Sequence, residues 1–251
     1  TFLFLLLVSS IAFGQKSSTL SSSSKDQFDQ LRVKTERILP FNTDSARIYA
    51  AQLMQMANDS KSEQLLAIAI IMKLKTNDSG KDDLDLNKKS LAINTKLNAV
   101  DEIARNYMLF GEIYLNKADY TNAVMYFNKS LDISKKNKLF TLSKKNYRSL
   151  STLYGLQEDY PKALQYALEA LQLEKERPNK NDKAFAHICL ADYYDYTGNK
   201  TRSNENYQIA YNLFKEVKNE YNMALTLMNW SINYEESNPI KSLEMGWEAQ
   251  K

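Results

Sequence analysis

Histidine and cysteine, two residue types that often carry chemistry, occur once each in this 251-residue chain, as His187 and Cys189. A metal site needs several such ligands, and a single cysteine cannot form an internal disulfide. Cys189 lies between Ile188 and Leu190, which favours a small packed thiol. His187 stands where tyrosines recur elsewhere in the chain, which favours packing between helices.

The polar turn at residues 77–83 (NDSGKDD) has acidic residues spaced somewhat as in a calcium loop. Because no bidentate glutamate or regular ligand series follows, a solvated turn is favoured. A Gly-rich phosphate loop, a Ser nucleophile elbow and a Cys-x-x-Cys motif are also missing from the sequence. We therefore expect no enzyme, cofactor or metal site within these residues; a kinase domain beyond residue 251 stays open.

The charge balance does not favour nucleic-acid binding. The formal net charge is +3, which is far from the basic stripe that competes with counterions on phosphate. Two local lysine runs, at 135–138 and 144–145, are expected to be ordinary solvated charge.

The elements that carry these side chains follow from an internal repeat. Tyr114, Tyr154, Tyr194 and Tyr234 are spaced 40 residues apart, and such a period is typical of stacked repeats. Six further positions recur around each tyrosine, at −7, −4, −3, +9, +13 and +16. The three complete sets are Tyr107, Phe110, Gly111, Tyr114, Ala123, Phe127 and Ser130; Tyr147, Leu150, Ser151, Tyr154, Ala163, Ala167 and Ala170; and His187, Leu190, Ala191, Tyr194, Ser203, Tyr207 and Ala210.

The spacing within each unit predicts two helices. Offsets of three, four and seven residues fall on one helical face, and polar turn signals separate the two halves of every unit. Small residues at fixed positions, such as Gly111, Ala163 and Ala210, would let the paired helices approach closely. The predicted fold class is therefore all-α, built from antiparallel helix pairs.

The pattern Tyr107-x2-Phe110-Gly111-x2-Tyr114-x8-Ala123-x3-Phe127-x2-Ser130 resembles the tetratricopeptide repeat (TPR). The resemblance covers residues 104 to 217 and implies a right-handed α-solenoid, TPR-like with a 40-residue period. That period exceeds the usual one of about 34 residues, and lysines 135, 175 and 215 stand where the family often has proline. A HEAT or armadillo array, with a period of about 40 to 47 residues, is the alternative, but the Gly-x2-Tyr-x8-Ala spacing favours TPR.

Four segments are predicted along the chain. Residues 1–14 resemble a signal peptide, because an apolar run from Phe2 to Phe13 ends in Ala-Phe-Gly and is too short to span a membrane. Residues 15–24 form a Ser-rich leader, with helical patterning beginning near Lys25. Residues 25–100 are expected to be degenerate N-terminal helical repeats. Residues 101–251 are expected to be TPR repeats, the last of them truncated.

In TPR proteins the first helices of successive repeats line a concave groove, so the resemblance implies a peptide or protein segment bound across them. The expected surface is basic in the second unit and acidic in the third, with apolar residues on either side. For each residue, plain exposure or packing against a neighbouring repeat is the alternative. The groove positions carried over are Arg105, Met108, Glu112 and Leu115; Lys145, Arg148 and Thr152; Phe185, Ile188, Asp192 and Asp195; and Leu225, Met228, Ile232 and Glu235.

One TPR groove subtype, the carboxylate clamp, binds chain-terminal acids. Lys145 and Arg148 fit that pattern, but Met108, Glu112 and Phe185 stand where it needs polar or basic groups. A pocket with mixed apolar and charged walls is the better expectation.

Two functions are compatible with an exported TPR domain. The first is the extracytoplasmic sensor of a bacterial signalling protein, with a membrane tether and a histidine kinase or helix-turn-helix output domain beyond residue 251. The second is a free periplasmic or outer-membrane-associated scaffold. In both, the domain is expected to be periplasmic and to bind protein rather than nucleic acid, and a homodimer stays open.

Overall fold

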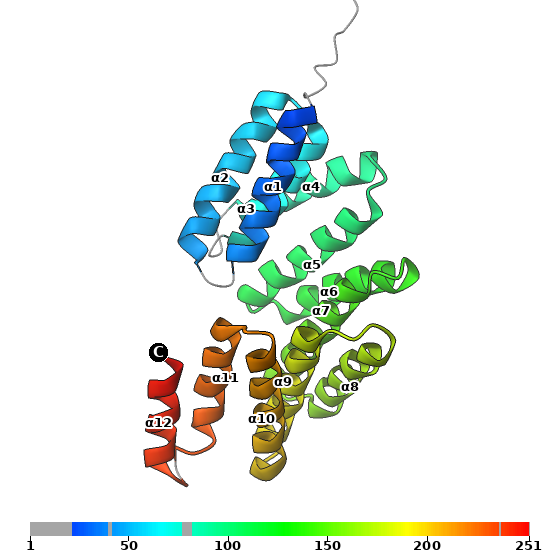
Figure 1. Ribbon diagram of the computed structural model, residues 1–251. Coiled ribbons are helices and arrows are strands. Elements are labelled where there is room, and N and C mark those ends of the chain that lie inside the picture. Colours follow the sequence, from blue (N-terminus) through cyan, green and yellow to red (C-terminus); the bar gives the residue numbers. More distant parts are fainter. Residues whose placement is uncertain (1–21, 40–41, 77–81, 236, 251) are drawn as a thin grey trace, which may run out of the picture.

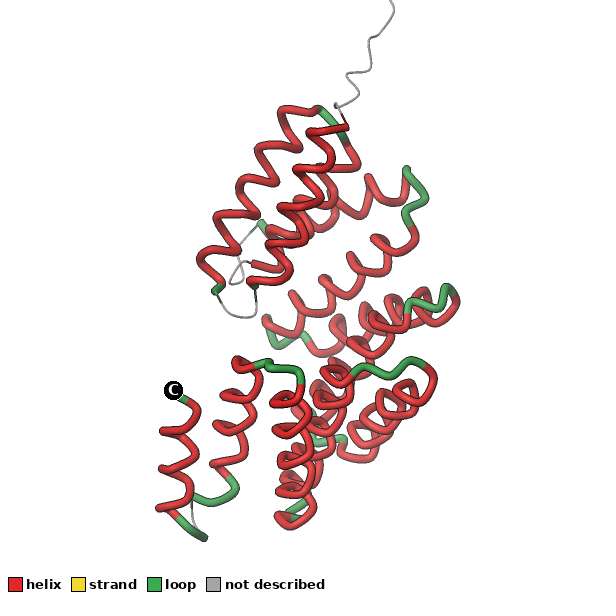
Figure 2. Tube along the Cα trace, in the orientation of Figure 1, coloured by secondary structure: helices red, strands yellow, loops and turns green. Residues whose placement is uncertain are grey.

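The computed structural model describes residues 22–39, 42–76, 82–235 and 237–250. Within these ranges the chain forms twelve helices and no strand (Figures 1 and 2), so the all-α prediction is confirmed. The helices are α1 (Ser22–Ile38), α2 (Thr43–Ser60), α3 (Glu63–Thr76), α4 (Asp83–Lys96), α5 (Val100–Asn116), α6 (Tyr120–Lys136), α7 (Phe140–Leu156), α8 (Tyr160–Glu176), α9 (Lys180–Tyr196), α10 (Lys200–Glu216), α11 (Glu220–Ile232) and α12 (Pro239–Ala249).

The predicted period is visible in the helix boundaries. The helices α5, α7, α9 and α11 begin at Val100, Phe140, Lys180 and Glu220, 40 residues apart. Their partners α6, α8 and α10 keep the same spacing, and α12 begins one residue early at Pro239. Each helix contacts the next along the chain, which gives an α-solenoid of helix pairs.

The turn inside each pair repeats the same local chemistry. An Asp or Asn caps the second helix by accepting a hydrogen bond from the backbone N–H three residues on, which satisfies a donor that the helix itself leaves unpaired. The residue before the cap has a positive φ, at Ala118, Glu158 and Gly198. The capping residues are Asp119, Asp159, Asn199 and Asn238.

Small residues bring the paired helices together, as predicted. A Cβ atom on Gly111 would lie 2.5 Å from the Phe127 ring, so only glycine fits between α5 and α6. In the next pair, Ala163 is buried and its carbonyl accepts a hydrogen bond from the Ser151 hydroxyl at 2.8 Å. Ala210 is fully buried.

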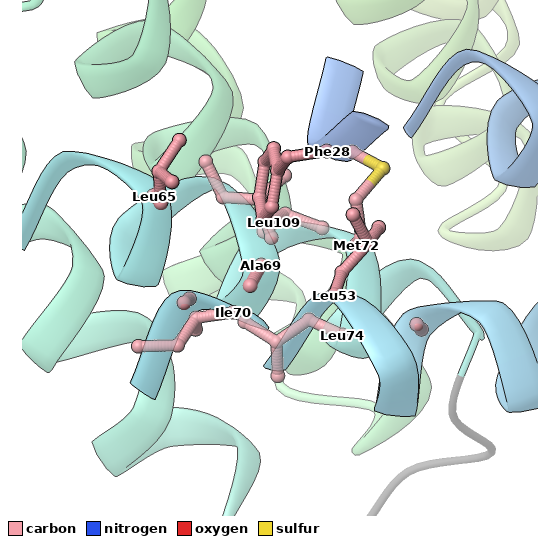
Figure 3. Packing of buried hydrophobic residues seen from close by; sticks show 11 residues of the cluster. Phe28, Leu53, Leu65, Ala69, Ile70, Met72, Leu74 and Leu109 are labelled. Carbon is pink, nitrogen blue, oxygen red and sulfur yellow. The ribbon is translucent and has the colours of Figure 1, made fainter. Parts of the chain in front are cut away.

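The N-terminal helices also fold as pairs. Helix α1 begins at Ser22, three residues before the expected Lys25, and packs with α2 and α3 around a buried core that includes Phe28, Leu53 and Ile70 (Figure 3). The predicted signal peptide at 1–14 lies outside the described residues, as does the leader at 15–24 except for its last three residues.

The stack is curved, and its odd-numbered helices lie on the inside. Contacts between successive pairs join α1 with α3, α3 with α5, α5 with α7 and α7 with α9. In the described ranges no comparably extensive contact joins one even-numbered helix to another. The odd-numbered helices are therefore closer together, and the pairs follow one another around a bend from α1 to α12 (Figure 1).

Candidate functional site

The predicted groove positions belong to odd-numbered helices, except for Glu235, which lies in the turn after α11. They form one row on α5, α7, α9 and α11, which we call the inner wall. Its members share the same four register positions in each 40-residue unit. The inner wall therefore carries one set of side chains per pair, and its chemistry changes from pair to pair.

Four cations gather at the N-terminal end of the inner wall. Lys75 on α3, Arg105 on α5, and Lys145 and Arg148 on α7 all interact electrostatically with one another or with Glu112. We call these four residues the basic patch. The pKa of Lys75 is lowered to about 8, chiefly by burial and then by the positive charge of Arg105.

Burial also shifts the pKa values of Lys145 in the basic patch and of the neighbouring Glu112. Burial lowers the pKa of Lys145, and the charges of Arg148 and Arg105 add to that effect. Burial raises the pKa of Glu112, while the cations around it oppose the rise. Glu112 is the inner-wall carboxyl group among these cations, and Arg105 is also paired with Glu102 on α5 at 3.7 Å, so the positive charge of the patch is partly balanced.

Lys75 did not appear among the predicted groove residues. It stands 40 residues before Leu115, so extending the register back by one unit would have found it. The unit from α3 to α4 lacks the full repeat pattern, so the predicted row of groove positions begins at α5. Lys75 also lies 3.8 Å from Glu36 on α1, which ties the patch to the first helix pair.

Arg148 and Met108, two of the predicted groove residues, differ in their contacts and burial. Arg148 places its guanidinium group 4.0 Å from the centre of the Phe185 ring, which links α7 to α9 by a cation–π contact. Met108 is only 5% exposed and belongs to the buried core. Met108 is therefore a packing residue, and its prediction as a partner-binding residue is corrected here.

The centre of the inner wall is acidic. Asp192 accepts a hydrogen bond from the Tyr207 hydroxyl at 2.6 Å. Burial, with the nearby charge of Asp195, raises the pKa of Asp192 to about 6 against the effect of that hydrogen bond. Asp195 is paired with Lys200, at the start of the partner helix α10.

The C-terminal end of the inner wall is apolar and exposed. Leu225, Met228 and Ile232 on α11 are 38%, 54% and 54% exposed. Of the remaining predicted positions, Thr152 and Glu235 are exposed, and Leu115 and Ile188 are half-buried. The wall therefore passes from basic to acidic to apolar along the chain.

The single histidine and cysteine are placed for packing. Cys189 is buried, and burial raises the pKa of its thiol to about 12, so the reactive thiolate is suppressed. The Asn206 amide donates to the Arg202 carbonyl, and its oxygen faces His187 Nδ1 at 2.9 Å. His187 Nδ1 therefore carries the proton. Burial lowers the pKa of this imidazole.

Among the described residues, no group of three His, Cys, Asp or Glu side chains is arranged to hold a metal ion. No helix in the same ranges has the length and apolar character needed to cross a bilayer.

Comparison with known proteins gives a fold and no family. No protein-family model matches the sequence, and no curated protein matches it either. Among solved structures, the chain is similar to the crystal structure of BtubC (BKLC) from P. vanneervenii, with a TM-score of 0.59 and 15% identity. The match covers 92% of this chain and 88% of that chain. At this identity the likeness concerns the fold alone, and it agrees with a helical repeat protein.

Proposed function

We propose that this protein is a TPR-type solenoid that binds an extended protein segment along its inner wall. The observation that carries the proposal is the succession of three zones on neighbouring odd-numbered helices: the basic patch, the acidic pair Asp192 and Asp195, and the exposed apolar residues of α11. A segment lying across the helices would meet each zone in turn. Peptide recognition of this kind uses charge for register and apolar contacts for affinity.

The basic patch favours an acidic stretch in the bound segment. Lys75 and Lys145 are each disfavoured as cations by burial and by neighbouring positive charge. A carboxylate from a partner would offset both effects, because an opposite charge stabilises the protonated amine. The acidic pair farther along the wall would then select a basic or hydroxyl-bearing residue.

Two observations support the TPR type over a HEAT or armadillo array. The tight contact between Gly111 and Phe127 joins the two helices of one pair at the positions that the TPR pattern predicts. The helix lengths are also uniform, since α5 to α10 each have 17 residues. The 40-residue period itself is longer than the usual TPR period of about 34 residues and falls in the HEAT and armadillo range.

We further propose that the domain is exported and serves as the extracytoplasmic sensor of a signalling protein; the alternative is a free periplasmic or outer-membrane-associated scaffold. Export rests on the apolar run of residues 2–13 and on the small residues before Gln15. Fractionation of cells producing the native full-length protein tests the location. Retention with the inner membrane supports the sensor, whereas release with the periplasmic contents or retention with the outer membrane supports the scaffold.

Binding of labelled peptides tests the inner wall. A peptide with glutamates followed by leucines should bind about tenfold more tightly than its glutamine counterpart, since one charge-assisted contact is worth about 1.5 kcal/mol or more. The double variant Arg148→Glu, Asp192→Lys should abolish this preference. Asp132→Lys with Lys136→Glu on α6 makes the same pair of charge changes at exposed positions outside the wall and serves as the control. Equal binding by both double variants would refute the proposal.

A further inference from the structure

From α4 onwards, the connections between helix pairs follow one rule with one exception. After α4, α6 and α10, the chain turns through a residue with positive φ, and the next residue donates its N–H to the carbonyl five residues earlier. Such a turn satisfies the carbonyl groups left free at a helix end. The positive-φ residues are Asn98, Lys138 and Lys218, and the hydrogen bonds run from Ala99 to Asn94 (2.9 Å), from Leu139 to Ser134 (2.8 Å) and from Asn219 to Phe214 (2.9 Å).

The exception is the connection from α8 to α9. Pro178 occupies the register position of the positive-φ residue, and its ring holds φ near −65°, so the left-handed turn cannot form. The Asn179 N–H donates instead to the Glu174 side chain, at 2.7 Å from Oε2. The Glu174 carboxylate thus replaces the carbonyl that serves at the other connections.

A buried lysine completes this substitute turn. Lys144 on α7 is paired with Glu174, and its Nζ also donates to the Arg177 carbonyl at 2.5 Å. The side chains of Lys144 and Glu174 are only 6% and 7% exposed. The pair therefore links α7 to the α8–α9 connection, where the left-handed turn is absent.

A cavity of about 630 Å³ lies at this connection. Its apolar surface comes from Leu171 on α8, Pro178 in the connection and Leu213 on α10. Most of its polar residues carry a positive charge or form an ion pair with a neighbouring side chain. They are Glu174, Lys175, Asn179, Lys180, Lys183 and His187.

The charges around the cavity leave a positive excess. Lys144 is shared between Glu174 and Asp182, which lies 3.5 Å from its Nζ, and Lys180 is paired with Glu216 at 2.7 Å. Among the described residues, neither Lys175 nor Lys183 forms an ion pair. The cavity thus combines an apolar interior with two ammonium groups, Lys175 and Lys183, that form no ion pair among the described residues.

We propose that this cavity binds a small amphipathic carboxylate, with its carbon chain against Leu171, Pro178 and Leu213 and its carboxylate at Lys175 and Lys183. A volume of this size is within the range of small-molecule sites, which are mostly apolar with a few fixed polar groups. The site lies at the α8–α9 connection and uses none of the inner-wall residues. It is therefore independent of the peptide-binding function proposed above.

Titration calorimetry with octanoate tests the site, and 1-octanol serves as the uncharged comparison. The wild-type protein should bind octanoate at least about tenfold more tightly than 1-octanol, because only octanoate gains charge-assisted contacts. Lys175→Glu should weaken octanoate binding about tenfold. Lys215→Glu provides the matched control, since Lys215 holds the same register position one unit later and does not line the cavity. It should leave the affinity within twofold.

A filling substitution tests the apolar half. Leu213→Trp should reduce the binding of both octanoate and 1-octanol, and circular dichroism with thermal unfolding establishes that each variant is folded. The proposal is overturned by any of three results: no octanoate binding to the folded wild-type protein at millimolar concentration, equal losses in Lys175→Glu and Lys215→Glu, or equal affinity for octanoate and 1-octanol.

Discussion

Two junctions between helix pairs solve the same packing problem with different chemistry. Where α4 meets α5, Asn106 donates to Asn87 Oδ1 (2.7 Å) and accepts from Asn94 Nδ2 (2.8 Å), and Ser90 shares this network; we call it the amide junction. Where α8 meets α9, the equivalents of Ser90 and Asn106 are the buried alanines 170 and 186, and the equivalent of Asn94 is Glu174. We call this second one the ion-pair junction.

The two junctions share the register of their helix pairs but differ in their polar contacts. Both junctions keep the 40-residue register, so the distance between pairs is maintained by helix length and small side chains. The polar groups are local solutions, because each buried donor and acceptor needs a partner wherever it occurs. The ion-pair junction also compensates for Pro178, which removes the usual backbone turn, and the cavity lies beside it.

The largest effect is expected from breaking the ion-pair junction. Lys144→Met should lower the free energy of unfolding by about 3 to 5 kcal/mol, because it leaves the Glu174 carboxylate buried without its cation. Urea unfolding measures the change. Lys180→Met, which breaks an exposed pair with Glu216, should cost about 1 kcal/mol or less.

A second substitution tests this explanation. Adding Glu174→Gln to Lys144→Met should recover roughly 2 kcal/mol, since the unpaired charge is removed while an acceptor for Asn179 remains. No recovery would mean that the loss comes from packing and not from charge.

The amide junction should show the next largest effect. Asn106→Leu keeps the side-chain volume similar and should cost about 3 kcal/mol, because the Asn87 and Asn94 amides lose buried partners. Thermal and urea unfolding measure it. At the same register in α11, Thr226 donates only to the Asn222 carbonyl of its own helix, so Thr226→Val should cost about 1 kcal/mol. Similar losses at both positions would show that the network adds no stability.

A double-mutant cycle sharpens the role assigned to Pro178. In a Pro178→Gly background the connection can form the left-handed turn, so Glu174→Ala should cost less than in the wild-type protein. We expect a coupling of about 1 kcal/mol between the two sites, whereas independent sites add within about 0.5 kcal/mol. Additive losses would contradict the idea that Glu174 replaces a backbone acceptor.

The last effect concerns pH, and it sets the conditions under which the other stability changes should be compared. The pKa of Asp192 is about 6 in the folded protein against an ordinary value of 3.8, so the unfolded chain loses this proton first and stability falls as pH rises from about 4 to about 6. Asp192→Asn should raise the stability by up to about 3 kcal/mol at pH 7, since one pKa unit corresponds to about 1.4 kcal/mol, and leave it unchanged near pH 4. Unfolding midpoints measured from pH 4 to pH 7 test this expectation. A gain of the same size at every pH would assign the effect to packing.

Part of the difference between the two junctions could be predicted from the sequence alone. Asn106 and Asn146 are 40 residues apart, as are Ser90 and Ser130, so a polar junction was detectable as a second repeat beside the tyrosines. Pro178 interrupts a row that has Asn98, Lys138 and Lys218 at the same register. Its role needed backbone angles, because the sequence does not show which residue of a turn has positive φ.

For the inner wall too, the sequence predicted one part and the tertiary structure decided another. The register correctly placed the predicted row on odd-numbered helices, because the offsets that define a helical face also define which face repeats. It did not distinguish Met108, which is buried, from Met228, which is 54% exposed. Exposure depends on the neighbouring pair, and the pairs around these two methionines present different side chains to them.

The sequence by itself determined the helices, their pairing and their period, because those depend on apolar spacing, caps and small residues that lie close together along the chain. Only the tertiary structure decided which charges share one wall, which polar groups pair across a junction and where a cavity is left. Those outcomes depend on groups brought together from different helices, such as Lys144 and Glu174, and no local pattern encodes their distances.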